Sequence, residues 1–290
     1  MDDASIHPDT RVASRPGPAR RTLRINGYLL TGGLILAILA AVGLFAPILA
    51  PTDPNAINPV LSLKPFGFQH HLLGTDNLGR DLTSRLVYGG RITLISGAIA
   101  ALISVAVGTA LGLFASYYKG WVDLIIMRMT DILMGFPFIL LAILIVAALG
   151  PSTINALIAV AIANVPFAAR LVKSEAVRVR EREFITAATA LGANHARIIW
   201  AHMLPNIISI TVPTLFLTTG WMIGQTSALS FLGLGTQPPT ADWGSMLAES
   251  QNYMGSLPEV AMLPGLMIVV AVVGLNLFGV GLRTTLLRET

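Results

Sequence analysis

Residues 183–206 read Glu183-Phe-Ile-Thr-Ala-Ala-Thr-Ala-Leu-Gly192-Ala-Asn-His-Ala-Arg-Ile-Ile-Trp-Ala-His-Met-Leu-Pro205-Asn206, a polar stretch between two hydrophobic segments. The pattern predicts two short amphipathic helices hinged at Gly192, because glycine readily takes the positive φ that ends a helix. Asn194 is a favoured residue for capping the second helix, and Pro205 is expected to close the run. A rigid helix pair between membrane spans is suited to be a docking site for another protein. The alternative is an ordinary cytoplasmic loop with an amphipathic helix.

The rest of the chain has the composition of an integral membrane protein. Of its 290 residues, 54% are hydrophobic and only 12% are charged, far from the average soluble domain. A helix needs about 20 apolar residues to cross the hydrocarbon. Apolar stretches of suitable length lie near residues 27–50, 91–116, 122–149, 152–170, 206–230 and 260–282. The sequence therefore predicts an all-α protein with six transmembrane helices, and the absence of cysteine excludes disulfides and thiolate metal sites.

The basic residues predict the orientation. With the N-terminus in the cytoplasm, all but four of the 19 lysines and arginines fall on or near the cytoplasmic side, the exceptions being Lys64, Arg80, Arg85 and Arg91. The positive-inside rule then places both termini and the 171–205 loop in the cytoplasm. Residues 1–24 are expected to form a disordered cytoplasmic tail. Residues 25–50 are expected to be a retained first span, because their apolar run is longer than that of a secretory signal.

Residues 51–90 form a proline-rich outer loop that ends in a polar run. Asp76 is predicted to cap an amphipathic helix along the outer interface, whose apolar stripe would consist of Leu78, Leu82 and Leu86. Asp81 and Arg85 have the i,i+4 spacing of a helical ion pair. The alternative is that this piece merely leads into the second span.

Four stretches of the chain resemble one family. The 183–206 loop has the spacing of the EAA loop of ABC-importer permeases, matched at Ala187, Ala188, Gly192, Leu204 and Pro205, with Thr186 and His202 in place of the usual Glu and Ile. The segment before the second span resembles the dipeptide, oligopeptide and nickel permeases through Gly74, Asp76, Gly79, Arg80, Asp81 and Arg85. Residues 229–247, which alternatively form a plain outer turn, and residues 276–283 are also similar to that family. The sequence departs from the family pattern at Val165, Thr226 and Val280.

The resemblance implies a type I ABC-importer permease fold over residues 91–290, with cytoplasmic coupling helices in the 171–205 loop. It implies a non-catalytic subunit of the bacterial plasma membrane with short peptides as cargo and no nucleic-acid partner. Its expected partners are a homologous second permease, two cytoplasmic ATPases and an extracytoplasmic solute-binding protein. The residues expected to contact the ATPase are Thr186, Ala187, Ala188, Leu191, Gly192, His202, Leu204 and Pro205. The six matching residues of the outer loop are expected at an extracytoplasmic interface.

The chain is predicted to bind no nucleotide itself. A P-loop requires Gly-Lys-Ser/Thr to hold the phosphates, and Lys173, the only lysine before Ser or Thr, follows Val172. ATP and Mg²⁺ are therefore expected on the partner ATPases, with no cofactor or metal in this chain. A permease of the same family for nickel or another small solute remains an alternative. The adjacent histidines of the outer loop, His70 and His71, lack a third ligand nearby and are expected to be solvated loop residues rather than a metal site.

A stand-alone secondary transporter is a further alternative, because such proteins couple to ions through charged groups inside the membrane. The third span carries Asp123, Arg128 and Asp131, of which the last two have the spacing of a structural pair. Gly108-x-x-x-Gly112 predicts a face of close helix packing. The candidate polar groups for lining a path are Asn155, Asn164, Gln225 and Asn276.

Overall fold

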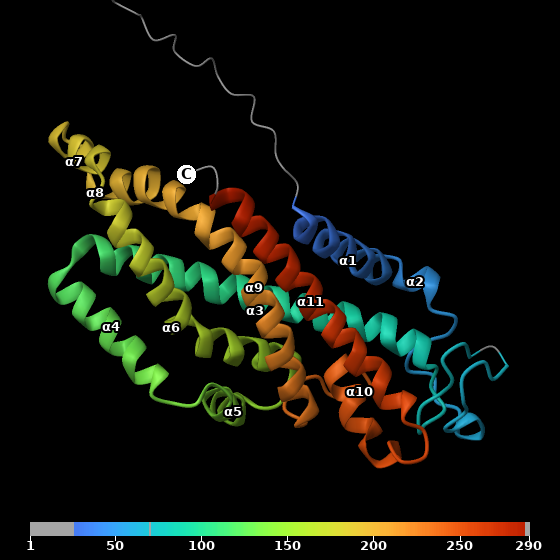
Figure 1. Ribbon diagram of the computed structural model, residues 1–290. Helices are drawn as coiled ribbons and strands as arrows, with labels where there is room; N and C mark the ends of the chain where they lie inside the picture. The colour runs from blue at the N-terminus through green and yellow to red at the C-terminus, as the bar shows by residue number, and fades with distance from the viewer. Residues whose placement is uncertain (1–25, 70, 288–290) are drawn as a thin grey trace, which may run out of the picture.

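The computed structural model describes residues 26–69 and 71–287 and is built from helices, with no strand in those ranges (Figure 1). The predicted tail of residues 1–24 and His70 lie outside the described residues. The α-helices are α1 (Gly27–Leu44), α2 (Ala46–Leu49), α3 (Leu82–Tyr118), α4 (Gly120–Met134), α5 (Phe138–Leu149), α6 (Thr153–Arg180), α7 (Glu183–Ala190), α8 (His195–Arg197), α9 (Leu204–Phe231), α10 (Trp243–Ser250) and α11 (Glu259–Leu287). Short 3₁₀ turns η1 (Pro59–Leu61) and η3 (Gln251–Tyr253) and a π-helical turn η2 (Ile198–Met203) complete the set.

Five helical runs are long and apolar enough to cross a membrane, namely α1, α3, α6, the run from α8 through α9, and α11. The helices α4 and α5 meet the same criteria together, but they are bent by 91° at the break between them. The predicted number of six spans is reached when this bent pair is taken as one. The third span is therefore broken, because Pro137 disfavours helical geometry at Phe136 and cannot donate a backbone hydrogen bond.

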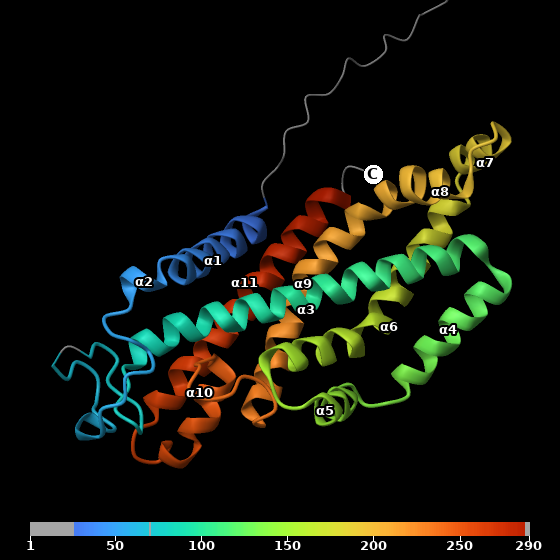
Figure 2. The ribbon, with the colours of Figure 1, turned by 180° about the vertical axis from the view of Figure 1, so that it is seen from behind.

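The long helix α3 runs through the middle of the bundle, with α6 and α9 packed along it (Figures 1 and 2). Next to α9 lies α11, and α1 packs on the far side of α11. The predicted Gly-x-x-x-Gly face is confirmed as the contact of α3 with α6. A Cβ atom at Gly108 would lie 2.4 Å from the Cβ of Ala168, and one at Gly112 would lie 2.7 Å from the carbonyl oxygen of Ala169.

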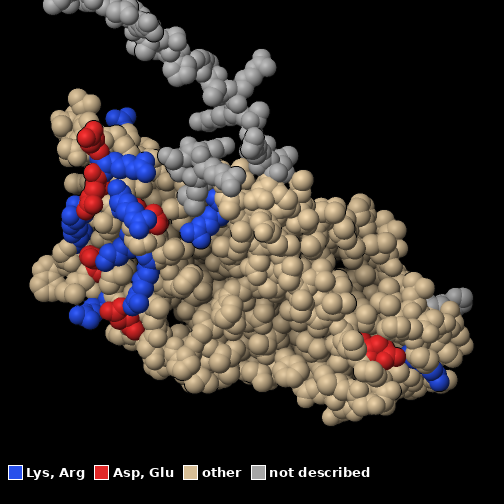
Figure 3. All heavy atoms as spheres, in the orientation of Figure 1, with Lys and Arg blue, Asp and Glu red and all other residues tan. Residues whose placement is uncertain are grey.

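Charged side chains gather at the two ends of the bundle. Figure 3 shows most of them at the end that carries α7 and α8, a long uncharged surface, and a few at the opposite end. At the first end, Arg128 Nη1 lies 3.6 Å from Asp131 Oδ2, which confirms the predicted pair, and Arg170 of α6 also contacts Asp131. An uncharged belt between two charged ends suits a bundle that lipid surrounds.

The close contact of α3 with α6 predicts that Gly108→Val destabilises the subunit by about 1–3 kcal/mol, because the added methyl groups meet the α6 main chain rather than a flexible side chain. The measurement is the thermal unfolding midpoint of the detergent-purified protein. Gly224→Val in α9 is the matched control, since no atom lies within 4 Å of its added Cβ. Equal midpoints for the two variants would contradict the close packing.

Candidate functional site: an elbow, a cavity and an outer clamp

The loop after α6 folds as predicted at its hinge. We call α7, the turn at Gly192, α8 and η2 the elbow (residues 183–203). Gly192 has a φ of +81°, and the side chain of Asn194 accepts a 2.8 Å hydrogen bond from the Arg197 amide. Both features confirm the sequence interpretation. Pro205 differs, because it is the second residue of α9 and the helical run from η2 continues through it instead of ending there.

The elbow is anchored to the ends of α3 and α6. The side chain of Ile185 is buried in a hydrophobic cluster that it shares with Leu113 of α3, Val172 and Val179 of α6, and Ile198, Ile199 and Met203 of η2. Tyr117 Oη lies 2.6 Å from His195 Nδ1, and Arg180 donates a 2.9 Å hydrogen bond to the Ser116 carbonyl. The elbow is thus held to two membrane-spanning helices by packing and by the Tyr117–His195 contact, while the Arg180 bond joins α6 to α3 next to it.

The opposite face of α7 is apolar and open. Phe184, Ala187 and Leu191 follow each other at helical spacing, and Leu191 is 89% exposed. Of the residues predicted to contact an ATPase, Thr186, Ala187, Leu191 and Gly192 are exposed around α7 and Ala188 is half-buried. His202, Leu204 and Pro205 lie at the base of the elbow, where η2 meets α9. The structure therefore brings the first group together and leaves the second apart from it.

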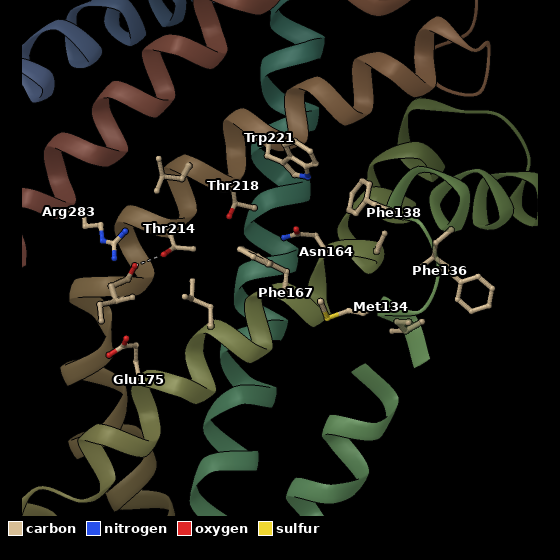
Figure 4. Close-up of a pocket in the computed structure, with 16 residues that line it drawn as sticks. Met134, Phe136, Phe138, Asn164, Phe167, Glu175, Thr214, Thr218, Trp221 and Arg283 are labelled. Carbon is tan, nitrogen blue, oxygen red and sulfur yellow. Dashed lines mark hydrogen bonds between the residues drawn. The ribbon is translucent and has the colours of Figure 1, made fainter. Parts of the chain in front are cut away.

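A cavity of about 710 Å³ lies between the broken third span and the helices α6, α9 and α11. Its wall is mostly aromatic and aliphatic, with Phe136, Phe138, Phe167 and Trp221 among its larger side chains (Figure 4). Phe138 and Trp221 meet edge to face at 6.1 Å. Its polar and charged groups are Asn164, Thr214, Thr218, Glu175 and Arg283.

Of the four polar residues predicted to line a path, only Asn164 lines this cavity, where its Nδ2 also donates a 2.6 Å hydrogen bond to Ser104 Oγ. Asn155 instead donates to the carbonyl groups of Leu149 and Gly150 at the end of α5. Gln225 and Asn276 lie elsewhere on α9 and α11. The aromatic lining was missed, since hydropathy does not distinguish an apolar residue that faces a cavity from one that faces lipid.

The loop before α3, which the orientation predicted from the sequence places on the outer side, is held by a largely buried ionic network that we call the outer clamp (Asp76, Arg80, Arg85 and Glu249). Arg80 lies 2.6 Å from both Asp76 and Glu249, and Arg85 lies 3.3 Å from Asp76 and 2.9 Å from Glu249. Asp76, Arg80 and Arg85 are each at most 4% exposed. The network joins the loop to the start of α3 and to α10.

The outer clamp corrects several predictions. The helix begins at Leu82 with Asp81 as its cap, through a 2.7 Å bond from the Ser84 amide, so Asp76 caps no amphipathic helix. Asp81 pairs with His71 at 2.8 Å rather than with Arg85, and His71 is therefore not a free loop residue.

All six residues expected at an extracytoplasmic interface are buried within the subunit. Gly74 and Gly79 have positive φ, and an added Cβ at either would collide with the main chain of the loop. Because their partners belong to this chain, these residues hold the loop rather than form an exposed surface. Across the described residues, no group of three or more His, Cys, Asp and Glu side chains could hold a metal.

Membrane-spanning helices around a cavity, with an anchored elbow at one end, define a membrane permease. The model of the family described as "Binding-protein-dependent transport system inner membrane component" matches residues 108–289. The chain belongs to this family, and it is therefore a multi-pass inner-membrane subunit of a transport system that depends on a binding protein.

Relatives and solved structures agree with this assignment. The chain is 43% identical over 268 residues to the dipeptide transport system permease protein DppC of Alkalihalophilus pseudofirmus, a match that covers 92% of this chain and 88% of the relative. It is 41% identical over 267 residues, with the same coverage, to the glutathione transport system permease protein GsiD of Pectobacterium atrosepticum. An inward-facing structure of the MetNI methionine ABC transporter shares the fold, with a TM-score of 0.58 and 18% identity over 69% of this chain and 95% of that chain.

The outer clamp predicts that Asp76→Asn destabilises the subunit by about 3–5 kcal/mol, because two buried guanidinium groups lose a charged partner. The measurements are the unfolding midpoint and the rate of proteolysis in the outer loop. Arg178→Gln is the control: its pair with Glu175 is exposed, and such pairs contribute about 0–1 kcal/mol. If the two variants were equally stable, the clamp would not hold the loop.

Proposed function

We propose that this chain is one permease subunit of an ATP-driven importer of short peptides. The observation that carries the proposal is the elbow, an open apolar helix face fixed to the spanning helices. The partners are a homologous second permease, two cytoplasmic ATPases that bind Mg-ATP, and an extracytoplasmic solute-binding protein. This chain supplies half of the path and does not hydrolyse ATP.

The elbow is suited to dock in a groove of an ATPase. The small side chain of Ala187 between Phe184 and Leu191 lets two surfaces approach closely, and the exposed apolar area gains stability when it is covered. Because Ile185 and Tyr117 tie the elbow to the bundle, a displacement of α7 passes to α3 and α6 instead of being lost in a flexible loop. The continuous helical run from η2 into α9 passes the same displacement on to α9. Coupling then needs only that nucleotide state and cavity state favour the same arrangement.

The cavity suits a short peptide. Its volume of about 710 Å³ falls in the usual range of small-molecule sites, about 300–1,000 Å³. Aromatic side chains suit the apolar side chains of a peptide, whereas Asn164, Thr214 and Thr218 offer hydrogen bonds to its main chain. Arg283 and Glu175 offer charges of both signs for its two termini. The similarity to dipeptide and glutathione permeases supports this cargo.

The proposed orientation places the elbow and both termini in the cytoplasm. The arginines at or near the elbow support it by the positive-inside rule, and these are Arg178, Arg180, Arg182 and Arg197. The outer clamp and α10 then lie on the side where a binding protein delivers its solute.

The proposal predicts ATP-dependent uptake of a labelled dipeptide by proteoliposomes that contain the whole assembly: this chain, the second permease, both ATPases and the binding protein. Unlabelled dipeptide should compete, and Ni²⁺ should neither compete nor accumulate. Uptake by this chain alone under an ion gradient would contradict the proposal and favour a secondary transporter.

The elbow predicts that Gly192→Val lowers both uptake and transport-coupled ATP hydrolysis by about tenfold or more. A β-branched residue is strained at a φ of +81°, by about 1–2 kcal/mol or more, so α7 is reoriented although no neighbour blocks the side chain. Leu191→Cys, the only thiol in its chain, should form a cross-link to the ATPase that Gly192→Val abolishes.

Ala190→Val is the matched control for this experiment. It adds a side chain of the same kind two residues away, on ordinary helical backbone and off the face of Phe184 and Leu191. Normal uptake and normal hydrolysis in Gly192→Val would remove the docking role from the elbow.

A further inference from the structure

A second, much smaller chamber lies at the outer ends of the helices, and none of the residues that line the large cavity lines it. It has a volume of about 10 Å³, enough for one ligand the size of a water molecule. Its wall comes from α3, α6, the end of α9, the loop after α9 and the start of α10. The groups used below are Ser96, Thr226, Ser227, Ser230, Thr236 and Asp242.

The chamber contains a buried carboxylate oxygen that the protein leaves without a hydrogen bond. Asp242 is 3% exposed, and its Oδ1 accepts a 2.9 Å bond from the Ser245 amide as the cap of α10. In the described part of the chain, neither Asp242 Oδ2 nor Ser227 Oγ has a partner, although Ser227 is only 6% exposed. Burial of such groups is costly unless something binds them.

Two of the surrounding hydroxyl groups, those of Ser96 and Thr226, offer only lone pairs to the chamber. Ser96 Oγ donates its proton to the Thr93 carbonyl at 3.1 Å, and Thr226 Oγ1 donates to the Met222 carbonyl at 2.9 Å. Ser230 Oγ accepts a bond from the Thr236 amide at 3.2 Å and keeps its own proton, so it is not counted among the acceptors. The hydroxyl oxygens of Ser96 and Thr226 can therefore accept but not donate toward the chamber. A wall of oxygen acceptors with one negative charge suits a hard cation and repels an anion.

The single negative charge in the wall of the chamber favours a monovalent cation as the ligand. Asp242 is the one acidic residue that lines the chamber. Arg85 lies within electrostatic range of Asp242 but is engaged by Asp76 and Glu249 of the outer clamp, and no ion pair to Asp242 occurs within the described ranges. One carboxylate balances one monovalent ion, whereas Ca²⁺ sites commonly use several carboxylates.

We propose that this chamber binds one monovalent cation, for which Na⁺ is the probe, through Asp242 Oδ2 and the hydroxyl oxygens of Ser227, Thr226 and Ser96. The ion would join α3, α9 and α10 where they already pack closely. The Trp243 amide donates a 3.1 Å bond to Thr93 Oγ1, and a Cβ at Gly244 would lie 2.3 Å from the Ser227 carbonyl oxygen. The cation thus stabilises the attachment of α10 at the outer mouth.

The test is the thermal unfolding midpoint of the purified full-length chain in NaCl, KCl and choline chloride at equal ionic strength. Na⁺ should raise the midpoint above that in choline, and the rise should saturate with concentration. Asp242→Asn should abolish the rise; asparagine keeps the size of the side chain and can still cap α10, so only the charge is lost. An equal response to K⁺ also supports the proposal.

A second variant keeps the test decisive if Asp242→Asn does not fold. Ser227→Ala removes a hydroxyl that has no partner within the described ranges, so it should leave the midpoint in choline unchanged. It should raise the Na⁺ concentration of half-maximal effect by about tenfold, the effect of one charge-assisted contact.

Asp53→Asn is the charge-matched control, because this carboxylate lies exposed in the outer loop, and it should keep the full Na⁺ response. Identical midpoints of the native chain in all three salts would mean that the chamber holds only water, and would overturn the proposal. So would a Na⁺ response that survives in Asp242→Asn.

Discussion

The close approach of α3 to α6 is the constraint on which the rest of the structure depends. Lipid provides no hydrophobic force between helices, so their association relies on close packing, which Gly108 and Gly112 allow. Each end of α3 then contacts a different part of the structure. At one end Tyr117 contacts the elbow, and at the other Arg85 takes part in the outer clamp. A helix of 37 residues thereby connects the site proposed for the ATPase with the outer mouth.

The two ends of α3 are attached by different kinds of contact, and this difference has a mechanical consequence. The elbow is held mainly by the hydrophobic cluster around Ile185, which tolerates sliding better than a network of directed bonds. The outer clamp consists of largely buried charges, and removal of any one of them takes a charged partner from two others and leaves the network unbalanced by one charge. The outer end is therefore the more rigid reference. The break at residues 135–137 lets α4 and α5 turn aside, so that α5 and the end of α4 can form one wall of the large cavity.

Sequence reasoning succeeded where the signal is local or periodic and failed where it depends on distant partners. The spans follow from hydropathy, and the turn at Gly192 with its cap at Asn194 follows from backbone preferences that neighbouring residues determine. Asp76 and Asp81 both satisfy the rules for a helix cap. The choice between them depends in part on Arg80, which pairs with Asp76 and reaches Glu249, 169 residues away in the chain. The break at Pro137 was not predicted, since residues 122–149 were taken as one continuous span. The aromatic cavity wall requires the rotation of each helix, which hydropathy does not give.

The arrangement of charges also distinguishes a coupled permease from an ion-driven transporter. In the third span, Asp123 lies 2.5 Å from Lys173, and Asp131 contacts both Arg128 and Arg170. These acids are neutralised at one end of the bundle, so they are structural pairs rather than a relay through it. The chamber at Asp242 shares no lining residue with the large cavity, so a cation there would stabilise the outer packing without travelling with cargo. In the proposed function the work enters mechanically, through an elbow that combines an open apolar face with attachment to the spanning helices.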